Sequence, residues 1–115
     1  MAKLSNYLRF PNQLDMRPFQ STSADANGSG GSYALSAVVI HSGTATHGHY
    51  TCFARPDPSG SPEDWVLIND HLVSRASAQQ VAQDAFGGTS RGFGGAFGGG
   101  ESSKNAYLLF YSKTD

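Results

Sequence analysis

The chain has 115 residues, of which 14 are glycine, and its eight Lys and Arg face nine Asp and Glu for a formal net charge of -1. This length allows one domain at most. The basic residues are scattered, which excludes a clustered basic surface of the kind that binds nucleic acid. No segment reaches the ~18 apolar residues that a membrane span requires. One cysteine, Cys52, and no apolar run of signal-peptide length favour an intracellular protein.

The first 32 residues predict an anchored segment followed by a loose connector. Pro11 ends any strand that begins at Leu4, because proline cannot donate a ladder hydrogen bond. Residues 21–32 are rich in Ser, Gly, Ala and Asn without periodicity, which predicts a flexible loop. Four apolar side chains are expected to anchor the part before it: Leu8, Phe10, Leu14 and Phe19.

The middle of the chain predicts three strands. Residues 33–41 are β-branched and apolar on both faces, as expected for a strand that is covered on both sides. A tight loop at residues 42–48 leads into a second strand at 49–55. A third strand is expected at 64–69, with Trp65, Leu67 and Asn69 on one face.

The last third predicts one helix and one strand. Ser77 and Gln80 have the spacing of a capping box, which predicts a helix that runs to about Ala85 and ends at Gly87 in the left-handed conformation. Residues 87–103 are Gly-rich and predict a second flexible loop. Residues 105–112 predict a strand whose apolar side chains alternate between two faces. The fold class is therefore α+β, an antiparallel sheet with one short helix.

Three histidines, His41, His47 and His49, surround the loop at residues 42–48. They are either incidental polar residues of that loop, ligands of a zinc ion together with Cys52, or the source of a general base. The spacing H-x5-H-x-H-x2-C argues against zinc. His49 and Cys52 are also three positions apart on one strand and should point to opposite faces. We therefore expect no metal.

A thiol-protease general base needs a rigid mount and a third group that fixes its tautomer. His49 follows Gly48, which allows a sharp turn and leaves space for a substrate chain. Asn69 ends the third strand and is expected to accept a hydrogen bond from the imidazole Nδ1–H. Asp70 has the chemistry for the same role. The alternative is that the Asn69–Asp70 pair only marks a turn.

Four motifs in chain order resemble the histidine box and its flanks in ubiquitin-specific proteases. They are residues 33–43, residues 48–50 (Gly-His-Tyr), residues 65–70 (Trp-Val-Leu-Ile-Asn-Asp) and residues 105–111 (Asn-Ala-Tyr-Leu-Leu-Phe-Tyr). Residues 72–76 and 86–88 look most like the herpesvirus-associated branch of that family.

The resemblance implies that residues 1–115 are the C-terminal, antiparallel-sheet portion of a papain-like cysteine protease domain that removes ubiquitin from proteins without a cofactor. His49 is similar to the general base, Asn69 to the third triad member and Asp70 to an assisting acid. That third member is usually Asp in the herpesvirus-associated branch, so Asn69 is a departure. Residues 42–48 resemble a loop beside the channel for the ubiquitin tail, which makes Gly48, Tyr50 and His41 expected substrate contacts.

The family's nucleophile lies in a Gly-Asn-Thr-Cys box, which this chain does not contain. Cys52 is expected to be buried in the core and to face away from His49. We therefore expect the isolated chain to be inactive and to depend on the missing N-terminal part of the catalytic domain. The alternative is an inactive ubiquitin-binding or scaffold protein.

Overall fold

The computed structural model describes residues 2–21, 30–88 and 103–114. The two predicted flexible loops, at residues 21–32 and 87–103, lie largely outside this part of the chain. Among the described residues, no helix has the length and apolarity needed to cross a lipid bilayer.

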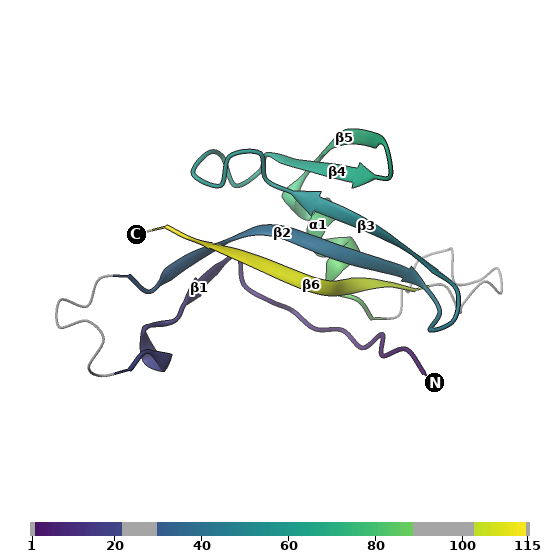
Figure 1. Cartoon of the computed structure of the whole chain (residues 1–115), viewed down its shortest axis with the longest axis horizontal. Coiled ribbons are helices and arrows are strands. Elements are labelled where there is room, and N and C mark those ends of the chain that lie inside the picture. The colour runs from purple at the N-terminus through teal and green to yellow at the C-terminus, as the bar shows by residue number, and fades with distance from the viewer. Residues whose placement is uncertain (1, 22–29, 89–102, 115) are drawn as a thin grey trace.

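The described residues form a six-stranded antiparallel sheet and one α-helix (Figure 1). The sheet order is β1-β2-β3-β4-β5, and β6 pairs with the other side of β2. The long central strand β2 therefore pairs with β1, β3 and β6. The elements are β1 Gln13–Asp15, β2 Ser32–Gly43, β3 Gly48–Ala54, β4 Trp65–Asn69, β5 Leu72–Ala76, α1 Ala78–Ala85 and β6 Ser103–Lys113, with a short 3-10 turn at Arg17–Phe19. This arrangement confirms the predicted α+β class with one short helix.

The predicted helix is α1, and its two ends form as expected. The Ser77 side chain accepts a hydrogen bond from the Gln80 backbone N–H at 3.1 Å. Gly87 has φ +76° and therefore adopts the left-handed conformation that ends a helix. Val81 and Ala85 are buried on the side of α1 that faces the sheet.

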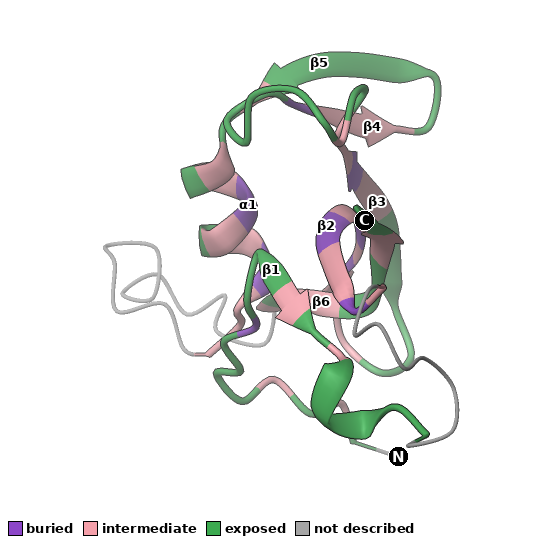
Figure 2. Cartoon of the chain, turned by 90° about the vertical axis from the view of Figure 1, so that its left-hand side faces the viewer, coloured by how far each residue is buried: buried purple, intermediate pink, exposed green. Residues whose placement is uncertain are grey.

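The core lies between α1 and one face of the sheet. Figure 2 shows buried stretches of α1, β2 and β3 that face one another across this layer. Four side chains in the core are fully buried: Phe53, Leu35, Ile40 and Val38. Alternate residues of β2, such as Ala37 and Val39, are only half-buried. The expectation that this strand is covered on both sides is therefore wrong for the described residues, in which the helix covers one face alone.

Two expected anchors of the N-terminal segment are also wrong. Phe10 is buried at 9% exposure, but Leu8 and Phe19 are 70% and 76% exposed. Backbone hydrogen bonds hold the segment near Leu8 instead, because its N–H donates to Phe86 O at 2.7 Å. Apolar residue type alone did not distinguish these cases.

The last strand does not alternate as predicted. The β2–β6 ladder shifts register between Val39 and Ile40, which pair with Leu108 and Ala106, so that Tyr107 is an extra residue of β6. Ala106 packs against the core, whereas Tyr107 and Leu108 are both exposed. A β-bulge of this kind interrupts the two-residue period on which the prediction depended.

Candidate active site

The strand register brings His49 and Asn69 to the same face of the sheet. Phe53 pairs with Leu67 across β3 and β4, so Thr51 and His49 lie on the face that Leu67 and Asn69 share. This is the face that carries the core and α1. The two side chains therefore lie at the ends of two paired strands, β3 and β4, and the buried core residues of these strands fix their backbones.

The imidazole of His49 contacts the side-chain amide of Asn69. The distance from His49 Nε2 to Asn69 Oδ1 is 2.8 Å, a good hydrogen bond. An amide oxygen only accepts, so Nε2 carries the proton and donates it. The predicted contact between the two side chains is present, but the expected donor was wrong: Nε2 rather than Nδ1 faces Asn69. Nδ1 has no hydrogen-bond partner in the described part of the chain.

Asp70 does not take part in this contact. It follows Asn69 in the two-residue turn between β4 and β5, where Asn69 pairs with Leu72. Its φ of 53° lies in the left-handed region, which Asp tolerates better than most residues. Within residues 2–21, 30–88 and 103–114, Asp70 has no hydrogen bond or ion pair. Asn69 and Asp70 therefore do mark a turn, as the alternative interpretation expected. Asn69 also contacts the imidazole of His49, whereas Asp70 does not.

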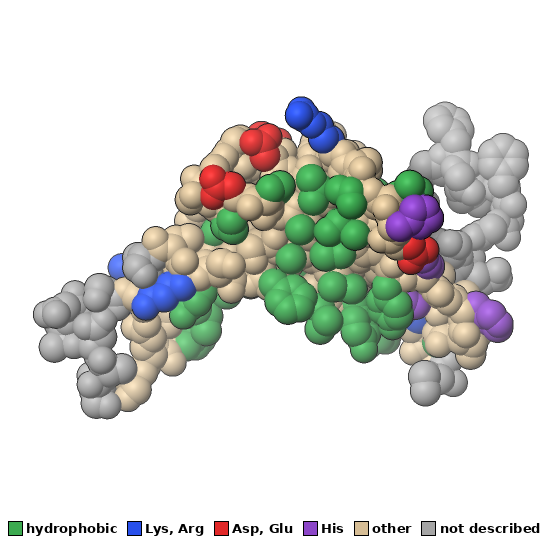
Figure 3. All heavy atoms as spheres, turned by 45° about the horizontal axis from the view of Figure 1, so that its top comes forward, with side chains coloured by type: hydrophobic (Ala, Val, Ile, Leu, Met, Phe, Trp, Pro, Cys, Tyr) green, Lys and Arg blue, Asp and Glu red, His purple; other side chains and the backbone are tan. Residues whose placement is uncertain are grey.

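The other predicted substrate contacts gather on the opposite face of the sheet. Tyr50 pairs with His41, and their rings lie 4.9 Å apart between centroids. Tyr107 of β6 meets Tyr50 edge-on at 5.5 Å. Burial, with a smaller contribution from the positive charge of Lys3, lowers the pKa of the His41 imidazole. These rings stand at one end of an apolar sheet face that also exposes Leu108, Phe110 and Val73; Figure 3 shows hydrophobic side chains gathered on this face and histidines at one end.

Gly48 is required by a neighbour within the chain. A Cβ added at this position would lie 2.1 Å from His41 Nε2 and 2.9 Å from Ser42 O. On that side the space is occupied by the His41 ring, not left open for a substrate chain as expected. His47, in the loop between β2 and β3, contacts Thr46 instead of the site.

The chain's one cysteine does not face His49. Cys52 pairs with Val39 and Ile68 and so lies on the side of the sheet opposite the core. It is half-buried rather than part of the core as expected, and burial raises the pKa of its thiol. A thiol in this position is not activated as a nucleophile, because reactive cysteines have lowered pKa values.

The described residues were also compared with the ligand sets of metal sites. They contain no group of three or more His, Cys, Asp or Glu side chains that could hold a metal ion.

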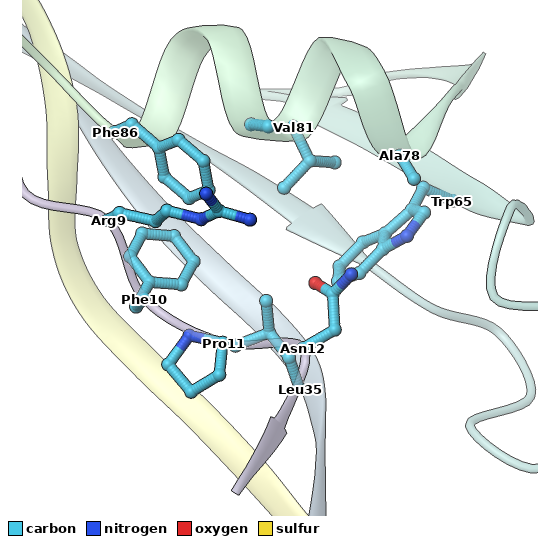
Figure 4. A pocket seen from close by; sticks show the side chains of 10 residues that line it. Arg9, Phe10, Pro11, Asn12, Leu35, Trp65, Ala78, Val81 and Phe86 are labelled. Carbon is cyan, nitrogen blue, oxygen red and sulfur yellow. The ribbon is translucent and has the colours of Figure 1, made fainter.

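A hollow of about 220 Å³ opens between the N-terminal segment and α1, with Phe10, Phe86 and Arg9 at one end and Trp65 at the other (Figure 4). Its lining includes neither His49 nor Asn69, so it is separate from the candidate active site.

Comparisons with known proteins agree on one family. The family model described as ubiquitin carboxyl-terminal hydrolase matches residues 1–111. Three similar proteins are ubiquitin carboxyl-terminal hydrolase nonstop of Drosophila melanogaster (39% identical), ubiquitin carboxyl-terminal hydrolase 22 of Homo sapiens (33%) and ubiquitin carboxyl-terminal hydrolase 15 of Schizosaccharomyces pombe (31%). Each match covers 96% of this chain but only 17%, 19% and 10% of the relative, respectively.

The structural comparison gives the same result. A chain in the structure of the SAGA Ubp8/Sgf11/Sus1/Sgf73 DUB module matches 99% of this chain with a TM-score of 0.64 and 31% sequence identity, and the match covers 20% of that chain. The fold of this chain thus matches one part of a longer chain. None of these names decides the placement in the herpesvirus-associated branch, which stays a prediction.

Proposed function

Because the chain belongs to the ubiquitin carboxyl-terminal hydrolase family, we propose that it contributes the general base and its orienting partner to thiol-dependent deubiquitination. The bond cleaved is the one that follows the C-terminal glycine of ubiquitin, and the substrates are ubiquitin conjugates within the cell. The single observation that carries this proposal is the 2.8 Å contact between His49 Nε2 and Asn69 Oδ1.

The contact between His49 and Asn69 supports a role for each side chain in the proposed reaction. Asn69 Oδ1 accepts a hydrogen bond from the Nε2–H and so fixes the tautomer in which Nδ1 is a base. Nδ1 of His49 takes the proton of a cysteine thiol, and the sulfur attacks the glycine carbonyl. The same nitrogen then returns the proton to the leaving lysine amine as the C–N bond breaks. Water hydrolyses the thioester and restores the thiol.

The nucleophile in this proposal comes from outside residues 1–115, because Cys52 lies on the other face of the sheet from His49. Loss of the nucleophile from a coupled triad costs about 10⁶ in kcat. The isolated chain is therefore expected to show no turnover of a ubiquitin–fluorophore conjugate. Turnover that Cys52→Ser abolishes would contradict this assignment.

The direct test uses a complete enzyme of the family in which residues 1–115 replace the equivalent segment. His49→Ala should lower kcat at least about 10³-fold, because the thiol loses its base. His47→Ala is the matched control and should keep most of the activity, since the His47 imidazole hydrogen-bonds to the exposed Thr46 and not to His49 or Asn69. Equal losses at the two positions would count against the assignment.

A second pair of variants separates the two polar residues of the β4–β5 turn. Asn69→Ala should reduce kcat strongly because the imidazole loses the acceptor that fixes its tautomer. Asn69→Asp should retain activity, since a carboxylate accepts the same hydrogen bond. Asp70→Ala should have little effect, because Asp70 does not contact the ring. A larger loss in Asp70→Ala than in Asn69→Ala would reverse the two roles.

The position of Cys52 also favours a second candidate, an inactive protein that binds ubiquitin. Titration of the isolated chain with ubiquitin distinguishes the two. Saturable binding, together with no activity in the complete enzyme described above, would support the second candidate over the first.

A further inference from the structure

Lys3 makes an unusual set of contacts for a residue so near the N-terminus. Its ammonium group donates to three backbone carbonyl oxygens: His41 O at 3.2 Å, Gly43 O at 3.0 Å and Ser103 O at 2.8 Å. An ammonium group has three N–H donors, so all three are used. Lys3 thus joins the last residues of β2 to the first residue of β6, at the point where Gly43 pairs with Ser103.

The segment that carries Lys3 is itself held in place. Leu4 O accepts a hydrogen bond from Asn105 Nδ2 at 3.0 Å, and Ser5 O accepts one from the Gly88 N–H at 2.8 Å. The Leu8 N–H donates to Phe86 O at 2.7 Å. Residues 4–8 are therefore fixed against β6 and the turn that follows α1. Lys3 reaches the three carbonyls from a defined position rather than as a mobile side chain.

The carbonyls that Lys3 holds belong to the end of the hairpin that presents the general base. Gly43 pairs with Gly48, and Ser42 pairs with His49. At this end β3 pairs with β2 alone, because the β3–β4 ladder stops at Cys52 and Ile68. The position of the His49 backbone therefore depends on how firmly the end of β2 is held.

We propose that Lys3 is a positioning residue for His49: its ammonium group fixes the end of β2 and, through the β2–β3 ladder, holds the imidazole where Nε2 meets Asn69 Oδ1. This inference rests on the function proposed above, because it concerns the same base. Burial lowers the pKa of the Lys3 ammonium.

Lys104 provides a matched control on the same strands. It pairs with Ser42 across β2 and β6, one position from the Lys3 contacts. Its ammonium is exposed and lies 4.0 Å from Asp84 Oδ2, an ion pair too exposed to hold the hairpin. Lys3→Met and Lys104→Met remove the same charge from the same part of the molecule, but only the first removes the bonds to the carbonyls.

The test reads the His49 ring and the hairpin by NMR in the chain of residues 1–115, without any assay of activity. In Lys3→Met, amide exchange at the Gly43–Gly48 end of the β2–β3 ladder should be about tenfold faster or more, because charge-assisted bonds are lost. The ring nitrogen signals of His49 should shift from a single tautomer, protonated at Nε2, towards a mixture. Amides near Ala34, where β2 pairs with β1, should exchange as before.

Two outcomes would overturn the proposal. The first is a Lys3→Met chain whose His49 ring signals match those of the unsubstituted protein, even if its stability is lower. The second is a Lys104→Met chain that changes as Lys3→Met does. If Lys3→Met does not fold, Lys3→Gln, with two donors on a shorter side chain, should show the displaced ring signals, and unchanged signals in that variant would equally reject the proposal. The enzyme assay of His49→Ala is independent of Lys3, so the two proposals can fail separately.

Discussion

Gly48 and His41 form a steric pair directly beside the candidate base. A Cβ at position 48 would lie 2.1 Å from His41 Nε2, so the His41 ring, whose centroid lies 4.9 Å from that of Tyr50, has to shift. Gly48→Ala should therefore lower the free energy of unfolding by about 1–3 kcal/mol, the usual cost of overpacking. Urea denaturation of Gly48→Ala, of His41→Ala and of the double variant measures these free energies of unfolding.

The double variant provides the check on this mechanism. His41→Ala removes the ring that the new methyl group meets, so the two substitutions together should cost less than their sum. The stability lost in Gly48→Ala should be recovered only in part, since the same Cβ also approaches Ser42 O at 2.9 Å. Additive costs would show that the ring is not the obstacle.

Asp15 provides a pH-dependent test on the strand that lies beside β2. Its carboxylate accepts hydrogen bonds from Arg17 Nε at 2.9 Å, Nη2 at 2.8 Å and the backbone N–H at 3.0 Å. The side-chain bonds, followed by the backbone bond, lower the pKa of Asp15 from 3.8 to about 2. Because the pKa is lower in the folded state, these hydrogen bonds stabilise the fold fully above the unfolded-state pKa of 3.8. This stabilisation is lost as the pH falls and the carboxylate is protonated.

Asp15→Asn should therefore be less stable than the unsubstituted chain above about pH 4, with the difference shrinking as the pH falls from there towards the folded-state pKa of about 2. Urea denaturation at several pH values between 2 and 6 measures this difference. A gap that does not depend on pH would mean that the ionised carboxylate is not the cause.

At the scale of single elements, the helix was predictable because its signals are local. Ser77 and Gln80 are three positions apart, and the bond between them forms as the spacing predicts. Ser77→Ala should lower the free energy of unfolding by about 1 kcal/mol, since the first turn loses its cap. Ser74→Ala, on an exposed strand position three residues earlier, is the control and should be neutral. Equal effects would show that the loss is not one of capping.

The elements that the sequence did not predict are those set by distant partners. Strand β5 is five residues long with four exposed positions, so no pattern of burial marks it, and it exists because it pairs with β4. Strand β1 has three residues and exists because it pairs with β2. The bulge at Tyr107 depends on the register that β2 imposes. Local propensity carries none of this information.

At the scale of the whole molecule, the sequence could predict that His49 meets the polar end of the neighbouring strand, but not which residue or which atom there it meets. His49 and Asn69 end neighbouring strands, and residue types at strand ends can be read from the sequence. The choice of Nε2 over Nδ1, and of Asn69 over Asp70, depends on ring orientation and on the left-handed turn at Asp70. The separation of Tyr50 and His41 from His49 follows from strand alternation, which places adjacent residues on opposite faces.

Because α1 covers only one face of the sheet, equivalent substitutions on the two faces should differ in their cost to stability. Phe53 and Phe110 are both strand phenylalanines, but Phe53 is fully buried under α1 while Phe110 is 50% exposed on the other face. Phe53→Ala should cost about 3–5 kcal/mol, because it leaves a cavity in the core, and that is a large fraction of the stability of a native domain. Phe110→Ala should cost far less, since half of that ring already contacts water. Thermal or urea denaturation of the two variants compares them directly, and similar losses would mean that the face opposite the helix is covered as well.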